Sequence, residues 1–575
     1  MQPPHINPHD WSKLQPAFAD LEAETLSADN IASWLTRYSD LEKTIYEGLS
    51  RAYRKKAEDT TDAAREAAYL NLVEFVLPPA KVAANRLEQK IAALPAGLIP
   101  PDSLEWTRRV RASLEIFRAE NVPLETELDK LGVEYDKTIG AFSIIVDGEE
   151  LTLYGALAKL QEPDRNLRET VYRALLKRWG ADRVQLEGLF LEMLNLRRSI
   201  AKNAGFADYR EYIWKQKARF DYSPSDCLTL HSSILTQVVP LLSETMNAHR
   251  ESLALETLRP WDVDVDSAGR APLKPYADVS DLEQTTQRVF SSLDPVLGEL
   301  FGSLMDGDLD LESRKGKGPG GFCDFHPLSA KAYIFMNAVG THDDVQTLLH
   351  EGGHAFHALL SHRAQPLFWN LHGPMEFCEV ASMGMEMLAQ PHLEHAKGGF
   401  YSYEDARRAR RDHLLEAVVK FLPYMAVVDA FQHWLYVDAS TDVTIEQINA
   451  AWVDLHQRFL PDVDFTGVEE GMAFRWQRQS HVFTAPFYYI EYGIAQLGAV
   501  QVWQNATRDE PVAVRQYRAA LERGNTAGLR ELFQTAGLRL AFDAPHVAGL
   551  MALVREHLYS QSSASCKGFV TPDQV

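Results

Sequence analysis

The stretch His350-Glu351-Gly352-Gly353-His354 carries the strongest signal in the chain. Two histidines four residues apart lie one helical turn apart on the same face, so both imidazoles can reach one cation. The glutamate beside the first histidine can then face the open coordination position and take a proton from a water molecule there. The spacing predicts a helix that holds a catalytic metal ion.

The two central glycines of this stretch are unusual for a helix, because each costs about 1 kcal/mol relative to alanine in a helix interior. Gly352 and Gly353 therefore indicate that another backbone segment, or a substrate, passes close to the helix. Residues 340–344 offer N-cap oxygens, and residues 345–360 supply an apolar stripe. The preceding run, residues 333–339, is rich in β-branched and aromatic side chains and predicts a strand that leads into the helix.

Composition narrows the class of protein. The chain has 575 residues, 46% of them hydrophobic and 24% charged, which is typical of a soluble globular protein. Its net charge of −22 argues against nucleic acid or an anionic membrane as a partner. Residues 1–5 lack the features of a signal peptide, and no run of about 18 apolar residues occurs. The four cysteines are scattered and form no CxxC pair. We expect a cytoplasmic location.

Helical periodicity dominates the rest of the chain. Apart from residues 333–339, the clear strand signals are residues 141–146 and 149–154, which flank a hairpin turn at Asp147-Gly148. The pattern predicts a mainly α fold with a few strands near its centre.

A catalytic zinc usually has three protein ligands, so a third must lie elsewhere. A third histidine ten residues after the first is excluded, because that position is Leu360. A glutamate on a second helix is the other common solution, and three candidates share one helical face: Glu376, Glu379 and Glu386. Three carboxylates on one face repel unless something cationic lies against them. A solvated acidic face is the alternative, although the helix carries many apolar residues. Spacing alone leaves the choice open.

Residues 337–357 and the segment Phe377-Cys378-Glu379-Val380-Ala381-Ser382 resemble the M3 family of zinc metallopeptidases. The closest branch is oligoendopeptidase F, with thimet oligopeptidase and neurolysin as more distant relatives. The resemblance implies that Glu379 is the third ligand. It also implies that Glu386 supports the ligands from beside the metal site. His357 is expected to support the site or to belong to the core, because a fourth ligand would close the metal to water.

Residues 480–493 resemble the family segment whose histidine and tyrosines lean over the zinc. Peptide hydrolysis needs donors aimed at the oxyanion of the tetrahedral intermediate. The resemblance implies that Tyr489, together with His481 or Tyr492, supplies these donors and that Tyr488 supports them or contacts substrate. Aromatic core packing is the alternative for each tyrosine. The histidine-to-tyrosine spacing differs from the thimet-like branch, so the tyrosine that stabilises the oxyanion stays open.

The resemblance further implies a two-lobed, mainly helical fold with a deep central channel and a small β-sheet near the zinc site. Residues 1–205 are expected to form an N-terminal helical region with the hairpin near residues 139–154, and residues 206–559 the catalytic region. The polar tail, residues 560–575, is expected to be disordered.

The expected activity is zinc-dependent cleavage of internal bonds in short peptides. One Zn²⁺ per chain would be held by His350, His354 and Glu379, with Glu351 as general base. Two alternatives stay open: a helical zinc carboxypeptidase, which uses the same motif, and a peptide-binding protein with a vestigial site. The chain is expected to be a monomer or a homodimer.

Overall fold

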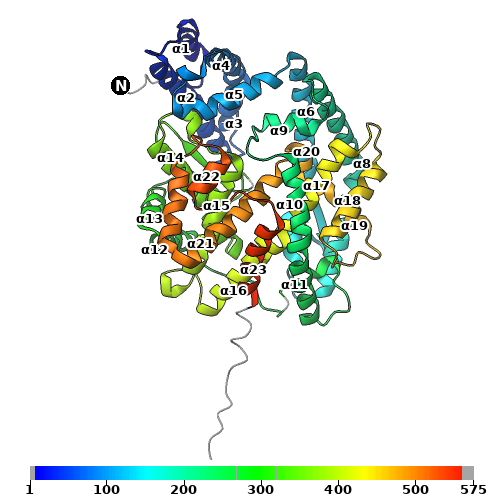
Figure 1. Ribbon diagram of the computed structural model, residues 1–575. Coiled ribbons are helices and arrows are strands. Elements are labelled where there is room, and N and C mark those ends of the chain that lie inside the picture. The colour runs from blue at the N-terminus through cyan, green and yellow to red at the C-terminus, as the bar shows by residue number, and fades with distance from the viewer. Residues whose placement is uncertain (1–6, 267, 319, 560–575) are drawn as a thin grey trace, which may run out of the picture. The chain divides into compact units, whose positions relative to one another are not determined.

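The structure is a computed structural model and describes residues 7–266, 268–318 and 320–559. It contains two compact units, each assembled from three separate parts of the chain. Unit 1 comprises Met1–Leu114, Pro272–Arg410 and Ile494–Leu540, and unit 2 comprises Glu115–Ala271, Arg411–Gly493 and Ala541–Val575. Figure 1 labels their helices. The division of the chain near residue 205 stays a prediction, and the predicted disordered tail lies outside the described residues.

Unit 1 is built from helices around one small sheet. Its elements are α1 (Trp11–Ala23), α2 (Ile31–Glu58), α3 (Ala63–Asn71), α4 (Leu77–Ala92), α12 (Val279–Leu293), α13 (Pro295–Gly302), β3 (Leu309–Glu312), β4 (Phe322–His326), β5 (Lys331–Ala338), α14 (His342–Ala364), α15 (Met375–Ala389) and α22 (Leu529–Thr535). Three further helices continue from one unit into the other along the chain: α5 (Leu104–Ile116), α16 (Tyr403–Leu414) and α21 (Tyr489–Glu522).

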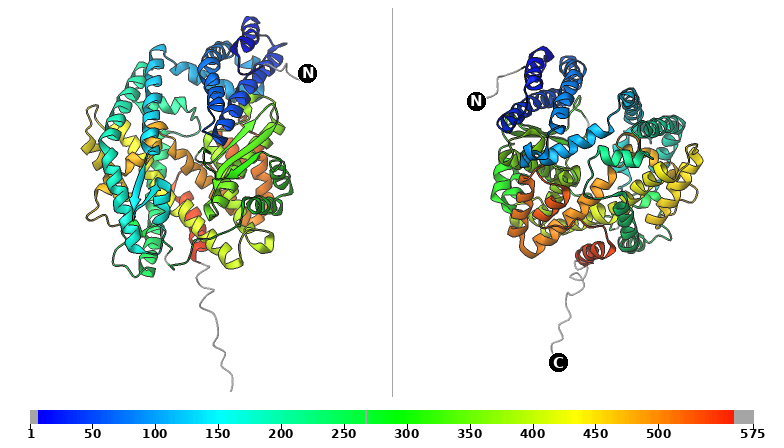
Figure 2. Two further views of the ribbon diagram at one scale, coloured as in Figure 1. Left: turned by 180° about the vertical axis from the view of Figure 1, so that it is seen from behind. Right: turned by 45° about the horizontal axis from the view of Figure 1, so that its top comes forward.

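The sheet of unit 1 has the order β3-β5-β4, with β5 parallel to β3 and antiparallel to β4. It is visible as green strands in the left view of Figure 2. The central strand β5 is buried from Ala332 to Met336, because α14 packs against it and α2 packs against β4. The predicted strand at residues 333–339 is thus confirmed to within a residue or two at its ends.

The chain passes from β5 into α14 through a short turn in which Gly340 has φ +93°. The Asp344 carboxylate fixes this turn, because its Oδ2 accepts the backbone N–H groups of Val339, Gly340 and Thr341 at 2.7–3.0 Å. A carboxylate at this position also suits the positive end of the helix dipole. The predicted motif helix and its start are confirmed, and the sheet determines where the helix begins.

Unit 2 is also mainly helical. Its elements are α6 (Val122–Gly140), β1 (Ser143–Val146), β2 (Glu149–Thr152), α7 (Leu153–Lys159), α8 (Arg165–Asn203), α9 (Tyr209–Gln216), α10 (Pro224–Gln237), α11 (Val239–Ser252), α17 (Phe421–His433), α18 (Ile445–Phe459), α19 (Glu470–Ala473), α20 (Ser480–Thr484) and α23 (Ala544–Tyr559). Short 3-10 and π-helical turns connect several of them.

The predicted hairpin of unit 2 is confirmed, although its first strand begins at Ser143 and not at residue 141. Strands β1 and β2 pair antiparallel, and the turn residues Asp147 and Gly148 have φ of 51° and 84°, which a two-residue hairpin turn requires. The second strand ends earlier than predicted, at Thr152. The Thr152 hydroxyl accepts the backbone N–H of Gly155 and thereby caps α7, so residues 153 and 154 become helical.

The mainly α fold with few strands is therefore confirmed. Within the described part of the chain, no helix combines the length and the apolar character needed to cross a membrane.

Candidate metal site and tyrosine cluster

The two motif histidines lie side by side on α14. The centroids of the His350 and His354 rings are 4.9 Å apart, and the side chains are 27% and 25% exposed. Four neighbouring residues of the helix are fully buried: Leu348, Leu349, Ala355 and Phe356. The helix therefore presents both imidazoles at one edge of the unit 1 core.

Helix α15 crosses α14 at the motif glycines. A Cβ atom on Gly353 would lie 2.4 Å from the carbonyl oxygen of Ala381 and 2.7 Å from the Cα of Ser382, both on α15. A Cβ on Gly352 would lie 2.8 Å from the ring of Phe290. The expectation that another backbone segment passes close to the helix is confirmed at Gly353, whereas the close neighbour of Gly352 is a side chain.

This close crossing brings the Glu379 carboxylate to both histidines. Its Oε2 lies 3.6 Å from Nε2 of His350 and 3.8 Å from Nε2 of His354. One ligand atom from each residue lies within 4.8 Å of the other two. The Ser382 hydroxyl donates to the same Oε2 at 3.0 Å and orients it. Two imidazoles and one carboxylate converging on a point are the donor set that zinc takes in catalytic sites.

Glu386 lies on the far side of the His350 ring. Its Oε1 is 2.6 Å from Nδ1 of His350, so it can accept the Nδ1 proton and leave Nε2 available for a metal ion. Burial disfavours the charged His350 ring, but this hydrogen bond and the charges of Glu386, Glu351 and Glu379 raise its pKa to about 9. The carboxylates thus create a place that favours a positive charge, whether a proton or a metal ion.

Glu351 is buried, with 7% of its surface exposed. Burial raises its pKa to about 7, the positive charge of His350 opposes this rise, and the charges of Glu379 and Glu386 add to it. Glu351 is therefore a carboxyl group that can exchange a proton near neutral pH. The pKa of His354 is well below its ordinary value, first through burial and then through the neighbouring imidazoles.

Two other predicted or candidate residues lie outside the ligand group. His357 is 3% exposed, its ring packs against Phe377, and burial lowers its pKa to about 3. Glu376 is buried as well, but it does not belong to the group of converging ligand atoms. The packing of His357 is that of a core residue next to the site.

In unit 2, the segment around His481 forms an aromatic cluster. The His481 ring lies 4.9 Å from the Tyr489 ring and 5.8 Å from the rings of Tyr488 and Tyr492, centroid to centroid. The structure thus brings the histidine and the three tyrosines of the predicted cluster together.

Two residues that the sequence did not indicate, Gln479 and Tyr424, fix the tautomer of the His481 imidazole. The amide nitrogen of Gln479 lies 2.7 Å from Nδ1 of His481, and the amide oxygen of Gln479 accepts the Tyr424 hydroxyl at 3.1 Å. An amide nitrogen can only donate, so Nδ1 accepts and Nε2 carries the hydrogen. Burial, with the charge of Lys217, lowers the pKa of His481 to about 4. The ring is neutral at pH 7 and offers an N–H donor from Nε2.

A strained turn holds the tyrosines in place. Phe487, directly before them, has φ +60°, which is unusual for a bulky side chain. Its N–H donates to Gln432 at 2.7 Å, and its carbonyl accepts a hydrogen bond from Arg219, which also pairs with Glu491 at 2.6 Å. These buried contacts stabilise a conformation that the free chain would rarely adopt.

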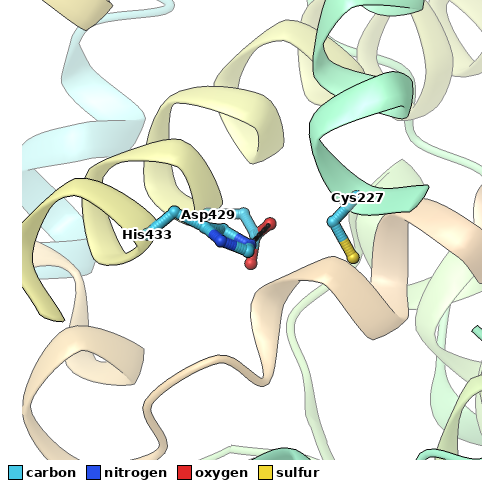
Figure 3. Close-up of side chains that lie close together, drawn as sticks. All are labelled: Cys227, Asp429 and His433. Atoms are coloured by element: carbon cyan, nitrogen blue, oxygen red, sulfur yellow. Dashed lines mark ion pairs between the residues drawn. The ribbon is translucent and has the colours of Figure 1, made fainter. Parts of the chain in front are cut away.

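A second group of possible metal ligands lies in unit 2, where Cys227 on α10 faces Asp429 and His433 on α17 (Figure 3). The Asp429 Oδ2 lies 2.9 Å from Nε2 of His231 and 3.3 Å from Nε2 of His433. Nδ1 of His433 lies 3.4 Å from a guanidinium nitrogen of Arg210, which can only donate. Nε2 of His433 therefore carries the hydrogen and lies within ion-pair distance of Asp429, but the geometry does not make a hydrogen bond. Asp429 thus lies between the imidazoles of His231 and His433.

Comparisons with known proteins agree with these features. The model of peptidase family M3 matches residues 158–551, well over half of the chain. Oligopeptidase PepF of Bacillus subtilis is 21% identical over 397 residues, which cover 67% of this chain and 56% of that protein. The chain thus spans just over half the length of this relative.

Solved structures match nearly the whole chain. A structure described as an oligoendopeptidase F superposes with a TM-score of 0.86 at 28% identity and covers 96% of this chain and 97% of the other. PZ peptidase A, solved with an inhibitor, gives the same TM-score and coverage at 25% identity. The chain therefore belongs to peptidase family M3, as its motifs predict.

Proposed function

We propose that this protein is a zinc-dependent endopeptidase that hydrolyses short peptides. The observation that carries the proposal is the convergence of His350, His354 and Glu379 beside the buried Glu351. His350 and His354 would bind zinc through Nε2 and Glu379 through a carboxylate oxygen. Zinc, when bound, would polarise the scissile carbonyl and lower the pKa of a water molecule towards about 7.

The remaining chemistry belongs to the side chains. Glu351 would take a proton from the attacking water and later deliver it to the leaving amine. The Nε2–H of His481 and the hydroxyls of Tyr489 and Tyr492 are the donors that we propose for the oxyanion. A neutral His481 supports this role, because Gln479 directs its hydrogen to Nε2. Tyr488 would contact substrate or support the other tyrosines. A cytoplasmic location and a preference for short peptides remain predictions.

Mass spectrometry of an end-blocked peptide of about a dozen residues tests the proposal, with and without a chelator. We expect internal cuts that disappear with the chelator and return with zinc. Trimming of only a peptide with a free C-terminus would indicate a carboxypeptidase, and no cleavage of either peptide would indicate a binding protein.

Replacement of the proposed general base tests the mechanism. Glu351→Gln should retain zinc and lower kcat by at least about 100-fold. Glu404→Gln, which changes an exposed glutamate on α16 of the same unit, is the matched control and should keep full activity. Normal turnover by Glu351→Gln would refute the assignment of Glu351.

A further inference from the structure

Two arginines of unit 2, Arg475 and Arg478, stand out because they lie close together and no carboxylate in the described part of the chain pairs with them. They occupy the ends of a 3-10 helix, Arg475–Arg478, between α19 and α20. Side chains three residues apart eclipse one another in a 3-10 helix, so both guanidinium groups project on the same side. The two residues between them, Trp476 and Gln477, are buried in the unit 2 core.

The core contacts hold this turn firmly. The Trp476 indole donates to Asn449 at 2.7 Å and stacks on Phe483, with ring planes 7° apart. The Gln477 carbonyl accepts the Tyr135 hydroxyl at 3.1 Å. The arginine pair is thus displayed by a rigid turn, and it does not depend on a mobile loop for its geometry.

Both guanidinium groups lie against aromatic rings instead of acids. The Cζ of Arg475 is 5.3 Å from the Tyr424 ring centroid, and the Cζ of Arg478 is 5.2 Å from that of Trp179. Among the described residues, neither group forms an ion pair or a hydrogen bond with a carboxylate. Arg259, another arginine of this unit, does pair with Asp464 at 3.3 Å.

The charges around the pair are unbalanced. Burial and the charge of Arg475 together lower the pKa of Arg478 to about 10. Asp264 acts on Arg478 through its charge without an ion pair, and Glu470 lines the same small cavity as Arg478. Two half-buried cations side by side are costly unless an anion neutralises them, and the chain has 80 acidic residues against 58 basic ones. The described residues provide no paired carboxylate for the two arginines, so an anion on a bound ligand would neutralise them.

The pair adjoins the proposed oxyanion donors. Tyr424, which carries Arg475 on its face, contacts the Tyr489 ring at 6.2 Å and donates its hydroxyl to Gln479. Gln479 directly follows Arg478 and binds His481. An anion held by the two arginines would thus belong to a ligand that also reaches the tyrosine cluster.

We propose that Arg475 and Arg478 form a subsite that binds a carboxylate of the peptide substrate. Guanidinium groups bind carboxylates through paired, charge-assisted hydrogen bonds. The carboxylate is either the C-terminus of a short peptide or an acidic side chain, and the experiment separates these two sources. This inference rests on the proposed peptidase function, which it extends to substrate choice.

Four peptides of one sequence and about nine residues provide the test. They differ in a free or amidated C-terminus and in one Glu or Gln on the C-terminal side of the cut. We expect the wild-type protein to prefer the peptide with the recognised carboxylate by at least about ten-fold in kcat/KM, the effect of one charge-assisted hydrogen bond. If kcat/KM depends on the free C-terminus, the recognised carboxylate is that of the C-terminus. If it depends on Glu, the recognised carboxylate is that of the side chain.

Variants connect this preference to the arginines. Arg475→Gln and Arg478→Gln should abolish the preference, measured as the ratio of kcat/KM for the charged and the uncharged peptide with each variant, whereas Arg475→Lys, which keeps the charge, should retain part of it. Arg458→Gln, which removes an exposed arginine of α18, should change nothing. The subsite would be overturned if the wild-type protein cleaved all four peptides at equal rates. A preference that survives in both glutamine variants would also overturn it.

Binding separates this inference from the proposed catalysis. Dissociation constants for the same four peptides, measured on Glu351→Gln, report recognition without turnover. If the wild-type protein cleaves none of the peptides but Glu351→Gln still binds the recognised carboxylate more tightly, the subsite holds and the proposed function fails. Cleavage with no discrimination in either measurement leaves the function standing and removes the subsite.

Discussion

Replacing Gly353 with alanine tests whether the crossing of α14 and α15 builds the metal site. The new Cβ would lie 2.4 Å from the carbonyl oxygen of Ala381 and 2.7 Å from the Cα of Ser382. An ordinary contact begins at 3.4 Å, so the helices must separate by about 1 Å, because backbone atoms cannot rotate away. Glu379 lies on α15 less than one turn before Ser382 and would move away from the histidines with it.

The steric cost should exceed the gain in helix propensity. Alanine favours a helix over glycine by about 1 kcal/mol, whereas overpacking of a close contact costs about 1–3 kcal/mol. We therefore expect a net loss of unfolding free energy. A misplacement of about 1 Å at a catalytic site lowers the rate by about 100-fold, so kcat/KM should fall by that order, and zinc should bind more weakly.

The assays are unfolding in urea, zinc content by mass spectrometry, and cleavage of the end-blocked peptide. Gly188→Ala is the matched control, because this exposed glycine of α8 has nothing within 4 Å of the new Cβ. It should stabilise the protein by up to about 1 kcal/mol and leave activity unchanged. Gly352→Ala meets the edge of the buried Phe290 ring at 2.8 Å and no backbone among its nearest atoms, so it should have an intermediate effect. A Gly353→Ala protein with normal stability, zinc content and activity would refute this account of the crossing.

Three further predictions concern residues around the two clusters. Glu386→Gln should lower zinc affinity by about 10–100-fold, measured by competition with a chelator, because the amide is a poorer acceptor for the His350 Nδ1 proton. Burial, with the charge of Arg475, lowers the pKa of His456 in the folded protein to about 3. As the pH falls, this histidine therefore takes up a proton in the unfolded chain at a higher pH than in the folded protein. The stability that this neutral ring contributes is present above about pH 6.5 and falls by about 2 kcal/mol by pH 5, and urea unfolding of His456→Gln should show a smaller loss over that interval. Gln432→Leu leaves the N–H of Phe487 without an acceptor and should cost about 1–3 kcal/mol in unfolding free energy; an unchanged urea midpoint would show that this hydrogen bond does not support the turn.

Local patterns in the sequence were sufficient for several elements. The Asp147-Gly148 pair predicts the hairpin because few other residues adopt two successive positive φ angles. The histidine spacing predicts the motif helix, and the paired glycines predict a close approach by another segment. Each of these inferences depends on the conformation of a few neighbouring residues, and the structure confirms each of them.

The interleaving of the two units has no such local signal. The parts of unit 1 are separated by more than 150 residues at one point of the chain, between Leu114 and Pro272. The same holds for Gln479 and Tyr424, whose hydrogen bond joins residues 55 positions apart and fixes the tautomer of His481. A single sequence contains the groups but not the pairing, because the pairing depends on how distant helices pack.

The choice among Glu376, Glu379 and Glu386 depends on both the local sequence pattern and the packing of distant helices. Their spacing places all three near one face of α15, and spacing alone cannot rank them. The close approach at Gly353 fixes the position of α15 along α14. It thereby fixes which atoms of the His350 ring each carboxylate of α15 can reach. Glu379 then lies 3.6 Å from Nε2 of His350, and Glu386, two turns later, reaches Nδ1 of the same ring at 2.6 Å. The absence of one methyl group at Gly353 therefore accounts for the different places of two glutamates that the sequence could not tell apart.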